Sequence, residues 1–253
     1  MNWAHAALLF AAGIAGGLTG SIAGLASVAT YPALLAVGIP PVAANVTNTV
    51  ALVFNGIGSI LGSQPELKGQ APWLWRVAPL AALGGAAGAA LLLSTPAEGF
   101  EKIVPILLGF SAVMIVLPQD KNPTGGDKLR RRRSIMAIEG FAIFLIAIYG
   151  GYFGAAAGVL LLALMLHTGA ANMAHANASK NVILAASNTV AAVIFVVLAP
   201  VVWSAVIPLG AGCLLGSRLG PIVVRHAPTT PLRLLVGAAG LALAIKLGVD
   251  AYR

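Results

Sequence analysis

Charged side chains are scarce in this sequence. They make up 9% of its 253 residues, whereas hydrophobic residues make up 59%. In a soluble domain about a quarter of the residues are usually charged, so the composition excludes a soluble fold. We therefore predict an all-α polytopic membrane protein, because lipid tolerates no irregular backbone unless protein surrounds it. The first expected partner is the lipid bilayer.

Groups that perform chemistry are also few. The chain has 7 acidic residues, and all but Glu139 fall in expected loops or at the C-terminus. The histidines lack metal-ligand spacing on a helix, and no phosphate-binding loop is present. Cys213 is the single cysteine, which excludes a disulfide framework. We expect no enzyme activity, no metal and no cofactor; Glu139 is either an interfacial residue or the one acid available for proton coupling.

The basic residues do not indicate a nucleic-acid partner, although the formal net charge is +8. Their densest group, Arg130–Arg133, lies between apolar runs. Membrane proteins concentrate Lys and Arg in such cytoplasmic loops. The segment is therefore expected to be a cytoplasmic connection, and nucleic acid is not an expected partner.

Long apolar runs dominate what is present, and a membrane span needs about twenty apolar residues. The runs lie at about residues 4–38, 42–63, 73–94, 102–118, 135–166, 178–198, 200–222 and 232–249. The first and the fifth are too long for one straight span and too short for two. Both are rich in glycine, so we expect half-helices that meet inside the membrane; a tilted or kinked single helix is the alternative. The helix-break glycines are predicted to be Gly20, Gly24, Gly154 and Gly158.

Three patterns recur in the same order and at nearly the same offset. They are Gly16-Gly17-x2-Gly20-x3-Gly24 with Gly150-Gly151-x2-Gly154-x3-Gly158, Ala44-Asn45-Val46-Thr47 with Ala176-Asn177-Ala178-Ser179, and Gly84-x3-Gly88-x7-Pro96 with Gly216-x3-Gly220-x7-Pro228. Their agreement predicts two homologous transmembrane repeats, 1–118 and 135–253, joined by a basic cytoplasmic linker at 119–134. Each repeat begins with a glycine-broken helix.

The distribution of Lys and Arg favours inverted repeats over parallel ones. With three full crossings per repeat and the linker in the cytoplasm, all but Lys102, Lys246 and Arg253 of the 15 Lys and Arg fall inside. Four crossings per repeat would place several more outside. Inverted repeats commonly build transporters with a binding site at the membrane midplane.

Polar side chains open the helix that follows each glycine-broken segment. The candidate substrate-binding residues are Asn45, Thr47, Asn48, Thr49, Asn55, Asn177, Ser179, Lys180, Asn181 and Asn188. Neutral donors at a helix N-terminus, together with one cation, favour a small anion. Helix capping is the alternative for Asn45 and Asn177, and snorkelling to the cytoplasmic interface is the alternative for Lys180.

At these residues the chain resembles the sulfite exporter TauE/SafE family of bacterial membrane transporters. The resemblance covers nearly the whole length and includes Pro32, Gly38, Ala44–Thr49 with Asn55-Gly56, Asn177-x2-Lys180-Asn181 with Asn188, Trp203 and Gly212-x3-Gly216-x3-Gly220. The segment Gly62–Leu67 departs from it, since related sequences usually carry an aromatic residue and arginines before the acidic residue.

The resemblance implies a secondary transporter or exporter in the bacterial cytoplasmic (inner) membrane. Its substrate would be sulfite, a sulfonate or a related organosulfur or carboxylate anion. A non-transporting membrane scaffold or a membrane-embedded enzyme is the alternative. The coupling ion, a proton or sodium, and a homo-oligomeric state are left open, as are the direction of transport and the anion.

Overall fold

The computed structural model describes residues 2–100, 102, 105–106, 132–155, 157–168 and 173–226, with a few single positions between 238 and 249. Within them every regular element is a helix: α1 (Trp3–Ala23), α2 (Ala26–Ala36), α3 (Pro41–Gly62), α4 (Gln64–Leu67), α5 (Ala71–Ser94), α7 (Arg132–Tyr152), α8 (Ala157–Thr168), α9 (Met173–Leu198) and α10 (Trp203–His226). The predicted linker and the apolar runs 102–118 and 232–249 lie wholly or mostly outside the described residues.

The helices have the length and surface of a membrane protein. Five of those described, α1, α3, α5, α9 and most of α10, are long and apolar enough to cross a membrane. Their outward faces carry exposed aliphatic side chains such as Leu83, Val197 and Ile207. Such exposure suits lipid and would be unfavourable in water. The all-α membrane fold is therefore confirmed.

Both long apolar runs are interrupted. The first forms α1 and α2, separated at Gly24, where φ is 76°. The second forms α7 and α8, separated by the segment that holds Gly154, where φ is 68°. Residues with a Cβ rarely adopt this left-handed conformation, so glycine permits both breaks. Gly20 and Gly158 instead lie inside α1 and α8, where they allow close packing.

Helix α9 begins five residues before the predicted apolar run 178–198, at Met173. The earlier start is possible because its polar side chains are shielded by other helices. Asn177, Ser179 and Lys180 are all at most 3% exposed. The apolar run 178–198 covers only part of α9, because hydropathy alone treats such polar residues as a boundary.

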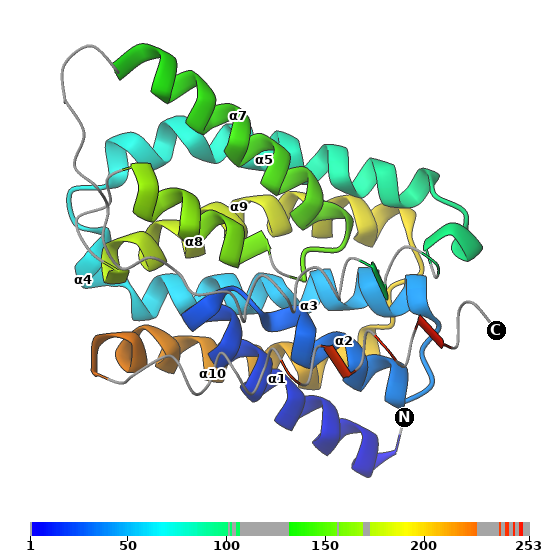
Figure 1. The fold of residues 1–253 in the computed structure, drawn as a ribbon. Coiled ribbons are helices and arrows are strands. Elements are labelled where there is room, and N and C mark those ends of the chain that lie inside the picture. The colour runs from blue at the N-terminus through cyan, green and yellow to red at the C-terminus, as the bar shows by residue number, and fades with distance from the viewer. Residues whose placement is uncertain are drawn as a thin grey trace.

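The helices pack into two groups that interleave the two halves of the chain. In the first, the α3 bundle, α10 packs against α1 and α3, and α2 packs against α1. In the second, the α9 bundle, α5 packs against α7 and α9, and α8 packs against α9. Helices α3 and α9 lie side by side in the middle of the molecule (Figure 1). Helix α5, the last helix described in the first half, therefore belongs to the α9 bundle. Helix α10, the last helix described in the second half, belongs to the α3 bundle.

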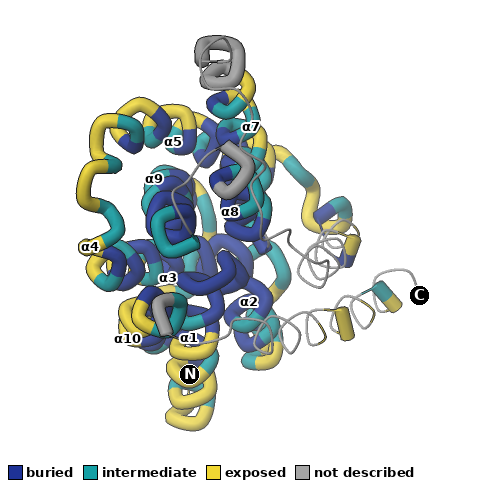
Figure 2. Tube along the Cα trace, turned by 60° about the vertical axis from the view of Figure 1, so that its left-hand side comes forward, coloured by how far each residue is buried: buried dark blue, intermediate teal, exposed yellow. Residues whose placement is uncertain are grey.

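Glycines set the closest approaches within each bundle. A Cβ added to Gly216 would overlap the backbone of Ile14 in α1, and one added to Gly88 would overlap the backbone of Ile148 in α7. These are the glycine patterns that repeat in the sequence, and small residues let membrane helices pack backbone to backbone. The burial pattern agrees: α2 and the middle of α3 are enclosed, whereas α5 exposes its outer face (Figure 2).

Candidate substrate site at the helix breaks

The polar start of α3 is fully enclosed by protein. Asn45 is the fifth residue of a helix that begins at Pro41, so it is not a capping residue. Its Nδ2 donates a hydrogen bond of 2.8 Å to the carbonyl oxygen of Tyr152, at the end of α7. Asn45 therefore connects the α3 bundle to the break in the α9 bundle.

The next polar residues of α3 are used within the α3 bundle. Asn48 accepts a hydrogen bond from Thr30 Oγ1 at 2.5 Å and donates one to Ser27 Oγ at 3.1 Å, which fixes α2 beside α3. Thr47 Oγ1 accepts a hydrogen bond of 3.0 Å from the backbone N–H of Val202, just before α10. Thr47 thus positions the chain entering α10.

Lys180 is buried, with no exposed surface. Its Nζ donates to the carbonyl oxygens of Gly20 at 3.2 Å and Ser21 at 3.3 Å, in the last turn of α1. Asn181 Nδ2 reaches the Ser21 carbonyl oxygen as well, at 3.4 Å. The amino group therefore points into the interface between the two bundles, and no part of it extends to the membrane surface.

Two further residues of α9 lie at the same end. Asn177 is buried, and its Oδ1 has no hydrogen-bond partner. Being inside α9, Asn177 is not a helix cap either. Ser179 Oγ donates to Gln70 Oε1, at the start of α5, and so acts within the α9 bundle.

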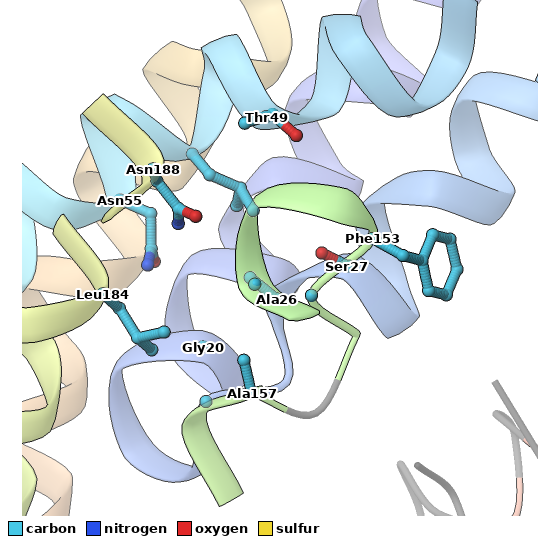
Figure 3. A pocket seen from close by; sticks show the side chains of 13 residues that line it. Gly20, Ala26, Ser27, Thr49, Asn55, Phe153, Ala157, Leu184 and Asn188 are labelled. Carbon is cyan, nitrogen blue, oxygen red and sulfur yellow. The ribbon is translucent and has the colours of Figure 1, made fainter. Parts of the chain in front are cut away.

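A small cavity of about 20 Å³ lies where the two broken helices meet (Figure 3). It is lined by predicted site residues from both halves together with residues that start the second half-helices: Gly20, Gly24, Ala26, Ser27, Thr49, Asn55, Gly154, Ala157 and Asn188. A volume of this size suits about one water molecule. The described conformation therefore leaves little free space between the two breaks.

Half-helix termini give the cavity its electrostatic character. Ala26 is the first residue of α2 and Ala157 the first residue of α8, and both line the cavity. Unpaired N–H groups and the positive dipole end favour negative charge at such positions. Asn55 and Asn188 add amide groups from α3 and α9, and Asn55 Oδ1 has no hydrogen-bond partner.

The structure thus divides the predicted residues into two sets. Thr49, Asn55 and Asn188 line the cavity with Gly20 of α1 and with Gly24 and Gly154 at the breaks. The hydrogen bonds given above join other helices or the segments between them, and they involve Asn45, Thr47, Asn48, Ser179, Lys180 and Asn181. Asn177 is buried, and its Oδ1 has no partner. Sequence reasoning missed Ser27, which lines the cavity, although it is the first hydroxyl after the Gly24 break.

Comparisons with known proteins agree with this architecture. The model of a family described as sulfite exporter TauE/SafE matches residues 8–247. The chain belongs to this family. It is 25% identical to a probable membrane transporter protein of Haemophilus influenzae, with 96% of this chain and 94% of that protein aligned. No solved structure matches the chain significantly.

Other relatives are similar over a comparable length. The chain is 28% identical to the probable membrane transporter protein ORF9 of a Sinorhizobium species, over 96% of this chain and 92% of that protein. It is 26% identical to the probable membrane transporter protein YfcA of Escherichia coli, over 97% and 90%. The family places this chain among multi-pass bacterial membrane transporters and not among enzymes.

Proposed function

We propose that the protein is a secondary transporter or exporter of a small anion across the cytoplasmic membrane, with the direction set by the ion gradients. The anion would be sulfite, a sulfonate or a related organosulfur or carboxylate anion. The observation that carries the proposal is the cavity at which the N-termini of α2 and α8 converge. A pair of half-helix N-termini favours an anionic group, and transporters with broken helices use them in this way.

The lining of the cavity supports an anion over a cation. Ser27, Thr49, Asn55 and Asn188 offer hydroxyl or amide donors, and no carboxylate is among the lining residues. A cation site would need several oxygen ligands, commonly with an acidic side chain. The name of the matching family supports sulfite or a chemically similar substrate.

Movement of the two bundles would open the site. Equivalent helices run in opposite directions in Figure 1, α3 against α9 and α5 against α10, which supports an inverted arrangement of the two halves. The moving units in this proposal are the α3 bundle and the α9 bundle rather than the halves 1–118 and 135–253. Their separation would expose the cavity to one side of the membrane and then to the other.

Two variants and a control test the proposal. Asn188→Leu and Asn55→Leu keep the side-chain size and remove the amide donors, so flux of the transported anion into liposomes should fall at least tenfold. Ser94→Ala removes an exposed hydroxyl that bonds only within its own helix, and its flux should equal that of the wild type. A wild-type protein that moves none of sulfite, sulfonates and carboxylates would favour a non-transporting scaffold.

A further inference from the structure

Lys180 bridges the two bundles at the edge of the cavity. It belongs to α9, and its two hydrogen-bond acceptors belong to the last turn of α1. The contact therefore joins the α9 bundle to the α3 bundle at the point where they must separate. Gly20 takes part twice, because its carbonyl oxygen accepts from Lys180 and its backbone lines the cavity.

Among the described residues, no charged side chain is a hydrogen-bond partner of Lys180. Both of its acceptors are neutral carbonyl groups, and Lys180 is the one charged side chain among the buried residues of the described part. The C-terminal end of α1 offers at most about half a negative charge. A buried ammonium without a full counter-charge is costly, so the protonated form needs a further negative group nearby.

The other charged groups described on α9 and its neighbouring helices do not supply this negative counter-charge. The charged and histidine side chains described on α9 and on the helices packed against it are His5, Glu66, Arg76, Glu139, His175 and Arg218. Each is at least partly exposed, and none is a hydrogen-bond partner of Lys180.

An anion in the cavity would supply the missing charge. We propose that Lys180 carries the proton that this transporter couples to its anion. The amine takes one proton from the solution that delivers the anion, and the ammonium returns it to the solution that receives the anion. Because coupling between two sites is reciprocal, anion binding strengthens proton binding and the proton strengthens anion binding by the same factor. The inference rests on the proposed function and names its coupling ion.

Anion binding to the purified protein in detergent tests the inference directly. The probes are methanesulfonate and isethionate, which stay ionised between pH 5 and pH 9, so any pH dependence belongs to the protein. Wild-type affinity should fall as the pH rises, by up to about tenfold per pH unit when one proton is coupled. Lys68→Gln, at an exposed lysine, should keep that slope.

Two substitutions at Lys180 separate charge from proton exchange. Lys180→Gln should bind weakly at every pH. Lys180→Arg should retain binding without the slope, because arginine keeps its charge throughout this range. A slope that persists in Lys180→Gln, a pH-independent wild type, or no binding of either probe overturns the inference. If Lys180→Gln does not fold, Lys180→Arg alone decides, since a slope retained there has the same meaning.

Flux measurements distinguish this inference from the proposed function. In liposomes, a pH gradient should drive wild-type anion accumulation on the alkaline side, whereas Lys180→Arg should exchange anions without being driven. pH-dependent binding without flux of any anion would remove transport and keep Lys180 as the proton site. Flux combined with pH-independent binding would keep transport and remove the role of Lys180.

Discussion

The backbones of Gly24 and Gly158 contact each other at the helix breaks in the described conformation. We expect this contact to exist in a closed conformation and to be lost when the two bundles separate. A Cβ added to Gly158 would overlap the backbone of Gly24, and a backbone cannot move aside as a side-chain tip can. Gly158 has no positive φ, so Gly158→Ala adds volume without straining its own backbone. Such overpacking typically costs about 1–3 kcal/mol. If the cost falls on the closed conformation alone, the open population rises by roughly 5- to 150-fold, at about 1.4 kcal/mol per factor of ten.

Thiol labelling can measure this shift. Ser27 lines the cavity and is 2% exposed, so Ser27→Cys in a Cys213→Ala background reports opening with little change in shape. Adding Gly158→Ala should raise the labelling rate of Ser27→Cys by roughly 5- to 150-fold. Gly150→Ala is the matched control, because a Cβ there would meet the side chains of Ala157 and Ser187 only at 3.6 Å, an ordinary contact.

Equal labelling rates with and without Gly158→Ala would refute the reasoning, as would an equal rise in the Gly150→Ala control. Global unfolding is excluded by a second measurement. Native Cys213 is buried between helices, and in the single Gly158→Ala variant it should stay unreactive. Labelling of Cys213 at the same rate as Ser27→Cys would mean that the variant unfolds instead of opening.

Two further predictions concern packing and topology. A Cβ at Gly151 would overlap backbone of α5, so Gly151→Ala should lower the unfolding free energy by about 1–3 kcal/mol. Gly99→Ala, which meets neighbours at 3.5 Å or more, should change it little; thermal unfolding in detergent compares the two. Cysteines placed in Gln119–Ser134 and at Pro228 should be labelled from the cytoplasm, and one in Ser94–Lys102 from outside. Opposite labelling of the first two would contradict inverted repeats.

Much of the fold could be predicted from composition and glycine spacing. The breaks follow from runs too long for one span, and Gly24 and Gly154 lie at them with positive φ. Helix packing follows the repeated small residues, since the spacing Gly84-x3-Gly88 faces α7 and Gly216-x3-Gly220 faces α1. These patterns are local in the sequence, so they can be recognised without knowledge of the tertiary structure.

The interleaving of the halves could not be predicted in this way. No residue of α10 indicates that it packs with α1 and α3 rather than with its own half, because its aliphatic surface suits any neighbour. The direction in which a buried polar side chain points could not be predicted from the sequence either. Asn55 and Lys180 lie on similar apolar helices, yet one lines the cavity and the other bonds to α1. The difference depends on which helix end lies opposite, and that is a tertiary property.

Asn48 and Lys180 hold corresponding positions in the two repeated sequences, but they make different contacts. Asn48 bonds to Ser27 and Thr30 within the α3 bundle, so its bonds can persist when the bundles separate. Lys180 bonds to α1 across the interface, so its bonds must break. Only the second position can therefore exchange a charge during opening. Among the described residues, the single buried cation therefore belongs to the second half of the chain, whereas both halves line the cavity.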